Sequence, residues 1–145
     1  MRPIAIELQA FGSFPGHVEI DFTALAERGL FVVAGDTGAG KSTIFDAMCF
    51  ALYGEMPLKE TKDVRSHHAE PEVPNFVRFT FECEGVRYIA ERSPERKRPS
   101  KRGGTTTADV AKALVVRCDG DTTVSLATKP TEAARTCVEL IGLKA

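Results

Sequence analysis

The nine residues GDTGAGKST, at positions 35–43, are the most informative stretch of this 145-residue chain. The first eight fit the pattern G-x-x-x-x-G-K-[ST] without a mismatch. Before them, residues 30–34 read LFVVA, a continuous apolar run typical of a strand buried on both faces. After them, apolar residues recur at three- and four-residue steps, which predicts a helix over residues 41–53 that Gly54 closes. A buried strand, a glycine-rich turn and an apolar helix in this order predict a phosphate-binding loop.

The residue types in this loop suit a nucleoside triphosphate. Glycines let the backbone curl so that successive N–H groups converge on phosphate oxygens, and the helix N-terminus adds its free N–H groups and positive dipole end. We expect Lys41 to reach the β- and γ-phosphates, Ser42 to hold Mg²⁺ through its hydroxyl, and Thr43 to donate to the α-phosphate. The predicted ligands are ATP and Mg²⁺, and the predicted binding residues are Gly35, Asp36, Thr37, Gly38, Ala39, Gly40, Lys41, Ser42 and Thr43. The alternative is a glycine-rich turn without a ligand.

Hydrolysis needs more than this loop provides. An ATPase also needs an acidic residue at the end of a second buried strand, and a group that orients the attacking water. Downstream of Lys41 no run of four apolar residues leads into Asp or Asp-Glu. We therefore expect no catalytic residue in this chain beyond Lys41, whose role is to stabilise phosphate, and the sequence resembles half of an active site.

The rest of the chain alternates like a sheet. Residues 4–10 and 18–22 predict two strands joined by a Gly/Pro loop, and residues 76–83 and 86–92 predict a hairpin with its turn at 84–85. Further strands are expected at 110–118 and 123–126, and a helix at 130–140 with Pro130 near its start and Gly142 past its end. These elements predict one α/β domain spanning 1–145, with a mixed sheet that includes an antiparallel meander.

Composition excludes several classes of protein. With 19 Lys and Arg against 20 Asp and Glu, the net charge is −1, unlike a wholly basic nucleic-acid-coating protein or an acidic disordered one. No apolar run approaches the ~20 residues needed to span a bilayer, so we expect a cytoplasmic protein without membrane contact. The four cysteines show no Cys-x-x-Cys spacing, which favours free thiols over metal ligands or disulfides.

One segment is strongly basic. Residues 92–102, RSPERKRPSKR, carry six positive side chains and one negative, and their prolines predict a mobile loop between two strands. Such a loop could neutralise DNA phosphates, and the candidate residues are Lys97, Arg98, Lys101 and Arg102. An ordinary solvated hairpin tip is the alternative, because no aromatic residues are interleaved to stack on bases.

Three further stretches reveal a family resemblance. LQAFGSF at 8–14, TIFDAMCFALYG at 43–54 and DVRSHHA at 63–69, together with the phosphate loop, resemble the N-terminal ATPase lobe of the SbcC family, in the ABC/SMC-like group. The resemblance covers essentially the whole chain. It implies an ABC-type head lobe of the P-loop NTPase fold, the start of an ATP-driven clamp that opens and closes to control access of DNA ends to an SbcD-type nuclease. By its position in the family, Arg65, with Ser66 and His67, would line the base or ribose edge of the nucleotide; an ordinary surface turn is the alternative.

The resemblance also implies which parts lie outside this chain. Family members continue into a glutamine loop, a long coiled coil with a cysteine hook, and a second lobe with signature and Walker B motifs, and ATP is bound between two heads. We therefore expect an N-terminal fragment of a nucleoid-associated protein, with the C-terminal lobe, a second head, the nuclease and double-stranded DNA as partners. Such a fragment should bind nucleotide without measurable ATPase. A small-molecule P-loop kinase and a non-catalytic nucleotide-binding interaction module remain alternatives.

Overall fold

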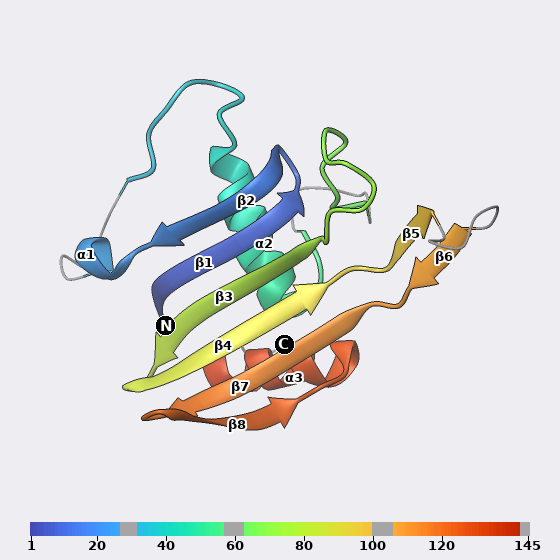
Figure 1. Cartoon of the computed structure of the whole chain (residues 1–145). Helices are drawn as coiled ribbons and strands as arrows, with labels where there is room; N and C mark the ends of the chain where they lie inside the picture. The colour runs from blue at the N-terminus through green and yellow to red at the C-terminus, as the bar shows by residue number, and fades with distance from the viewer. Residues whose placement is uncertain (27–31, 57–62, 100–105, 143–145) are drawn as a thin grey trace.

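A computed structural model describes residues 1–26, 32–56, 63–99 and 106–142 (Figure 1). Six strands form one antiparallel sheet in the order β2-β1-β3-β4-β7-β8, and two short strands form a separate ribbon. The elements are β1 (Arg2–Phe11), β2 (Phe14–Asp21), α1 (Thr23–Ala26), α2 (Lys41–Tyr53), β3 (Phe76–Cys83), β4 (Val86–Ser93), β5 (Arg96–Pro99), β6 (Thr106–Asp109), β7 (Lys112–Asp119), β8 (Thr122–Ala127) and α3 (Pro130–Ile141).

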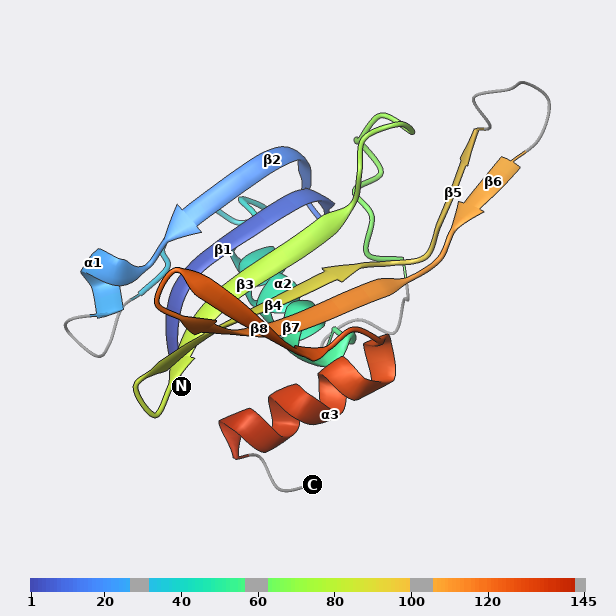
Figure 2. The ribbon, with the colours of Figure 1, turned by 60° about the horizontal axis from the view of Figure 1, so that its bottom comes forward.

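The core lies between the sheet and two helices on one of its faces. Figures 1 and 2 show α2 and α3 on the same side of the sheet, with α2 against β3 and β4 and α3 against β7 and β8. The alternation predicted for the first strand is confirmed, because Ile4, Ile6 and Leu8 all point into this core. On β3, Phe79 and Phe81 are fully buried with ring centroids 5.5 Å apart. Half-buried Phe76 lies under the guanidinium of Arg78 instead.

The opposite face of the sheet is polar. Arg78 on β3 donates to Glu91 on β4 and to Glu7 on β1, and His17 on β2 bonds to the second oxygen of Glu7. Both carboxylates raise the pKa of Arg78, and the hydrogen bond to Glu91 has the largest effect. A charged ladder of this kind keeps the sheet face that lacks a helix compatible with water, while period-two alternation keeps the other face apolar.

Most of the predicted elements are confirmed at nearly the predicted bounds. The helix α2 begins at Lys41 and ends at Tyr53, the β3–β4 hairpin turns at residues 84–85, and α3 begins at Pro130. The main error concerns LFVVA. Residues 32–34 form no strand and Val32 is 84% exposed, while residues 30 and 31 lie outside the described part of the chain. A strand needs a hydrogen-bonding neighbour, and no described segment pairs with residues 32–34.

The mixed sheet is also a wrong prediction for the described residues, because every pairing in them is antiparallel. The chain thus has an α/β fold built on an antiparallel sheet. None of the helices in the described ranges is long and apolar enough to cross a membrane.

The basic segment differs from the predicted loop. Arg92 belongs to β4 and is 4% exposed, with its guanidinium donating to the carbonyls of Ala51, Leu52 and Pro130 at 2.9–3.2 Å. It therefore joins the end of α2 to the start of α3. Beyond it, β5 and β6 pair and project past the sheet (Figure 2). Of the four candidate DNA residues, Lys97 and Arg98 lie on β5, and Lys101 and Arg102 lie outside the described residues.

Candidate functional site

The candidate site is the N-terminus of α2 and the loop that leads into it. Gly40 precedes the helix with φ +90°, and no side chain caps the helix within the described ranges. The first turn contains no acidic residue. The N–H groups of a first helical turn have no partner inside the helix, and together they carry the positive end of the helix dipole. This end of α2 is therefore suited to bind an anion.

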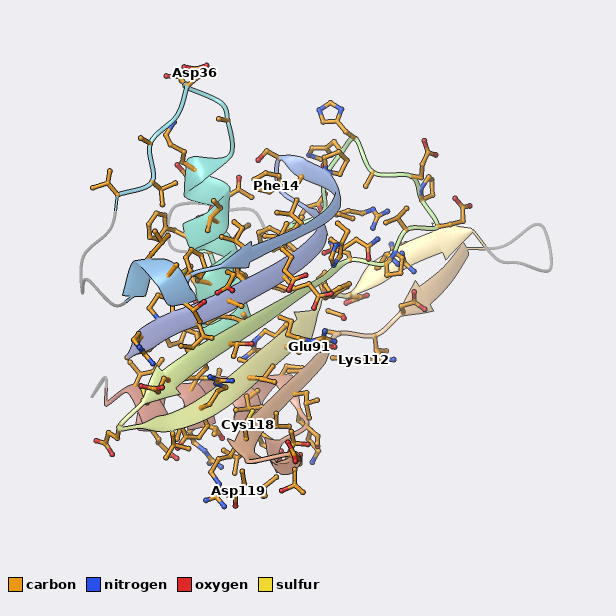
Figure 3. All side chains as sticks on the ribbon, turned by 60° about the vertical axis from the view of Figure 1, so that its left-hand side comes forward. Phe14, Asp36, Glu91, Lys112, Cys118 and Asp119 are labelled. Atoms are coloured by element: carbon orange, nitrogen blue, oxygen red, sulfur yellow. The ribbon has the colours of Figure 1, made fainter. Side chains whose placement is uncertain are left out.

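The side chain of Lys41 folds back over the loop. Its ammonium donates to the carbonyl oxygens of Gly35 and Asp36, at 2.7 and 2.6 Å. Within the described residues no carboxylate is paired with it, so its charge is met only by neutral carbonyls. The Asp36 side chain lies at the outer tip of the loop and points away from the helix (Figure 3). A phosphate would offer Lys41 a stronger, charge-assisted acceptor at the place where its ammonium already lies.

The turn between β1 and β2 forms a wall of this loop that the motif itself does not indicate. A Cβ at Gly40 would lie 2.6 Å from Phe14 Cζ and 2.7 Å from Ser13 Oγ. Within the first turn of the helix, Thr43 Oγ1 lies 3.0 Å from Ser13 Oγ. The sequence predicts the FGSF stretch only as a turn, although its Ser and Phe side chains carry this contact. Figure 3 shows Phe14 at this end of the hairpin, next to the start of α2.

The two hydroxyls that follow Lys41 have different surroundings. Thr43 is buried, 6% exposed, and its hydroxyl bonds to Ser13, so the structure places it against the β1–β2 turn. Ser42 is exposed in the first turn. A hydroxyl oxygen in a first turn without a competing carboxylate fits Mg²⁺, a hard cation that takes one or two protein oxygens together with phosphate oxygens and water. Within the described residues, no group of three or more His, Cys, Asp and Glu side chains could hold a metal ion. A metal ion at this site would therefore need the phosphate oxygens as further ligands.

The segment containing Arg65 is attached to the same turn through the backbone. Gly12 N donates to Val64 O at 2.9 Å and Ser66 N donates to Ala10 O at 2.8 Å. A bulge at Ala10, whose φ is +51°, turns that carbonyl out of the β1 ladder. The segment thus lies beside the wall of the phosphate loop.

The Arg65 side chain itself does not extend toward the loop. Its guanidinium donates to the carbonyls of Glu70 and Val73, which closes the turn over residues 65–73. Burial lowers the pKa of Arg65, as does the neighbouring charge of Arg96, while Asp63 opposes the shift. This arrangement matches the surface-turn alternative, and a contact between Arg65 and nucleotide stays a prediction.

The four cysteines are free thiols. Cys83 and Cys137 are buried, whereas Cys49 and Cys118 are partly exposed. Burial raises the pKa of the Cys137 thiol to about 11, although the positive charge of Arg92 acts in the opposite direction. A thiol with this pKa stays protonated at neutral pH and is a poor nucleophile. The two buried cysteines, Cys83 and Cys137, are therefore packing residues, and the chemistry of the site lies in the loop and helix of residues 35–43.

Comparison with known sequences identifies the domain. Residues 5–130 match the family model of an AAA domain. The chain belongs to the AAA domain family. Along its whole length this AAA domain is also similar to proteins named as the SbcC subunit of the nuclease SbcCD. It is 46% identical to that of Vibrio cholerae serotype O1 over 99% of the chain. It is 38% identical to that of Lactococcus lactis and 34% identical to that of Staphylococcus aureus strain MRSA252, each over 100% of the chain.

These relatives are much longer proteins. This AAA domain spans 14% of the length of each of the three. The resemblance to the N-terminal lobe of SbcC, which rests on four short stretches of sequence, is confirmed over the whole chain.

Proposed function

We propose that this AAA domain is the ATP-binding half-site of an SbcC-type ATPase. The observation that carries the proposal is the position of Lys41, whose ammonium lies near the N-terminus of α2 and donates to the carbonyls of Gly35 and Asp36. Replacing those carbonyls by β- and γ-phosphate oxygens would strengthen both bonds. Backbone N–H groups of residues 38–43 would hold the remaining phosphate oxygens, and Ser42 would hold Mg²⁺, which neutralises charge between the phosphates when it is bound.

The chain's own residues position a nucleotide and do little more. The loop and helix bind and orient the phosphates, Lys41 stabilises their charge, and Ser13 with Phe14 supports the start of the helix. The base or ribose edge would lie on the side of Arg65 and the segment around it. Hydrolysis requires an acid for the metal and a group for the water, and we assign neither to this chain. We therefore propose nucleotide binding without turnover for residues 1–145 by themselves.

In the longer protein, the proposed role is DNA processing. The relatives are named as a subunit of the SbcCD nuclease, so we propose an SbcD-type nuclease as the partner. Binding of ATP between this domain, a C-terminal lobe and a second head would open and close access of double-stranded DNA ends and hairpins to that nuclease. The setting would be double-strand break repair and recombination in the cytoplasm, close to the nucleoid.

Calorimetric titration of the chain with ATP in Mg²⁺ tests the proposal. We expect saturable binding that Lys41→Ala abolishes and that Ser42→Ala weakens only when Mg²⁺ is present. Lys129→Ala is the matched control, because Lys129 is 75% exposed and pairs with Glu132 at 3.5 Å, away from the loop. Equal ATP affinity of the Lys41→Ala and unaltered chains would refute the half-site.

A second assay separates the alternatives. The same preparations, incubated with ATP and Mg²⁺, should release no phosphate above the level of Lys41→Ala. Transfer of phosphate to a small acceptor would favour the P-loop kinase, and turnover that depends on Lys41 would contradict the assignment of this chain as half of an active site.

A further inference from the structure

The six-stranded sheet ends in two edges, β2 and β8. No described segment pairs with the outer side of either strand. Figure 1 shows β8 as the outermost strand at the lower end of the sheet. An edge strand leaves a row of backbone N–H and C=O groups free to pair with another chain, and proteins prevent such pairing with prolines, charged side chains or bulges.

The two edges differ in this protection. On β2, Pro15 removes a backbone donor, and the exposed side chains of His17, Glu19 and Asp21 line the strand. In contrast, β8 has the sequence TTVSLA, with no proline and no charged residue. Five of its six residues are exposed, and its Thr and Val residues favour extended backbone. The outer side of β8 is therefore the edge that is open to another strand.

Two exposed apolar side chains lie on this edge strand. Val124 is 41% exposed and Leu126 is 39% exposed. The register of β7 with β8 shifts between Val115 and Val116, so Leu126 has no residue opposite it on β7. Single exposed apolar residues are ordinary on a protein surface. Two of them on a neutral edge strand form a surface that a second apolar strand would cover.

The sequence of β8 and its flanks is complementary to itself when two copies run antiparallel. If Ser125 lies opposite the second copy's Ser125, Val124 lies opposite Leu126, and Asp121, just before β8, lies opposite Lys129, just after it. Asp121 and Lys129 are both exposed. Opposite side chains in an antiparallel pair are about 4.5–5.5 Å apart at Cβ, close enough to interact. By symmetry, this one register makes the apolar pair twice and the acid–base pair twice.

We propose that two copies of this chain associate through β8, edge to edge and antiparallel, with the two-fold axis at Ser125. Each copy presents the same strand, so the contact is isologous and joins the two six-stranded sheets into one continuous sheet. A six-residue strand is about 20 Å long, so the interface is small and the association is weak and depends on concentration. The contact uses neither the phosphate loop nor ATP, so it goes beyond the half-site proposed above.

Sedimentation equilibrium of the chain in reducing buffer without nucleotide tests the association. We expect the mean mass to rise toward that of a dimer as the concentration rises. Val124→Lys should lower the association constant several-fold, because it places a charge against the second copy's Leu126. Val110→Lys is the matched control, since Val110 is 70% exposed and lies between β6 and β7. A monomer at every concentration, or equal losses in the two variants, would overturn the proposal.

A charge exchange tests the register. Asp121→Lys and Lys129→Asp should each weaken the association, because like charges then face each other across the axis. The double variant restores opposite charges and keeps the net charge of the unaltered chain, so it should recover the association. A double variant that associates no better than the two single variants would overturn this register.

Disulfide cross-linking tests the position of the axis. Only a residue on a two-fold axis meets its own copy, and opposite Cα atoms in an antiparallel pair are about 4.5–5.5 Å apart, within disulfide range. In a background of Cys49→Ser and Cys118→Ser, oxidised glutathione should convert Ser125→Cys into a covalent dimer and leave Thr123→Cys monomeric. Equal yields from the two variants would overturn the proposed pairing. Both positions are exposed, so this test stays valid even if Val124→Lys unfolds the chain.

Discussion

At the scale of single residues, two glycines of the phosphate loop provide a matched comparison. Gly38 and Gly40 have nearly the same backbone torsion, φ +88° and +90°, but a Cβ at Gly38 meets nothing within 4 Å while one at Gly40 overlaps Phe14 and Ser13. Gly38→Ala should cost only the strain of the left-handed backbone, about 1–2 kcal/mol. Gly40→Ala should cost more, by up to about 1–3 kcal/mol, because the side chains of Phe14 and Ser13 must shift. Urea unfolding measures both, and equal losses would contradict the contact with the turn.

The pKa of Cys137 predicts an alkaline loss of stability. Burial raises the folded value to about 11 from the usual 9.0, so between these pH values the folded thiol keeps a proton that the unfolded thiol has lost. The contribution is complete below pH 9 and is lost as pH rises toward 11, by at most about 3 kcal/mol. Denaturant unfolding of the unaltered chain and of Cys137→Ala at pH 8.5, 9.5 and 10.5 isolates this loss. Parallel pH profiles of the two proteins would exclude it.

At the scale of elements, Arg92 is the side chain that fixes the end of α2. Arg92→Met leaves the carbonyls of Ala51, Leu52 and Pro130 without their donor, and we expect a loss of about 3 kcal/mol or more. Arg92→Lys should recover part of that loss. The control is Arg2→Met, which breaks an exposed ion pair with Glu82 and should cost less than about 1 kcal/mol. Similar unfolding midpoints for Arg92→Met and Arg2→Met would show that the bonds of Arg92 contribute little.

Elements whose signals are local could be predicted, and those that depend on distant partners could not. The helix over Lys41–Tyr53 carries its periodicity, its preceding glycine and its closing Gly54 within one stretch of sequence. The LFVVA run has strand composition, but a strand also needs a neighbour, and none of the described segments pairs with residues 32–34. In the sequence, the positive charge of Arg92 suggests that it belongs to the basic loop that follows it. Its alternation with Tyr88 and Ala90 is the better signal, because all three point to the core face of β4.

The same distinction applies to the candidate sites. The motif could be found from residues 35–42 alone, because its contacts with phosphate come from consecutive backbone groups. The Ser13 and Phe14 wall could not be found, since it depends on a turn folding over a helix that begins more than twenty residues later. A cavity of about 950 Å³ beyond the end of α2 could not be found either, because its lining residues, Asn75 and Lys97 among them, come from α2, from the loop before β3, and from β4, β5 and β7.

At the scale of the whole molecule, the β5–β6 ribbon projects from one corner of the sheet, where it is accessible to a long polyanion (Figure 2). If the basic side chains in this part of the sequence contact DNA, reversing the charge of Arg98, Lys101 and Arg102 should lower the affinity for a short duplex. It should also reduce the slope of log K against log salt by about 0.9 for each phosphate that the variant no longer neutralises. Lys97 is left unchanged because it also lines the cavity.

The control reverses Arg117, Lys129 and Arg135, three exposed cations near α3, with the same change in net charge. Fluorescence anisotropy at several salt concentrations measures both slopes. If the ribbon variant and the control lose affinity equally, the binding reflects net charge alone, and the ribbon is an ordinary solvated hairpin.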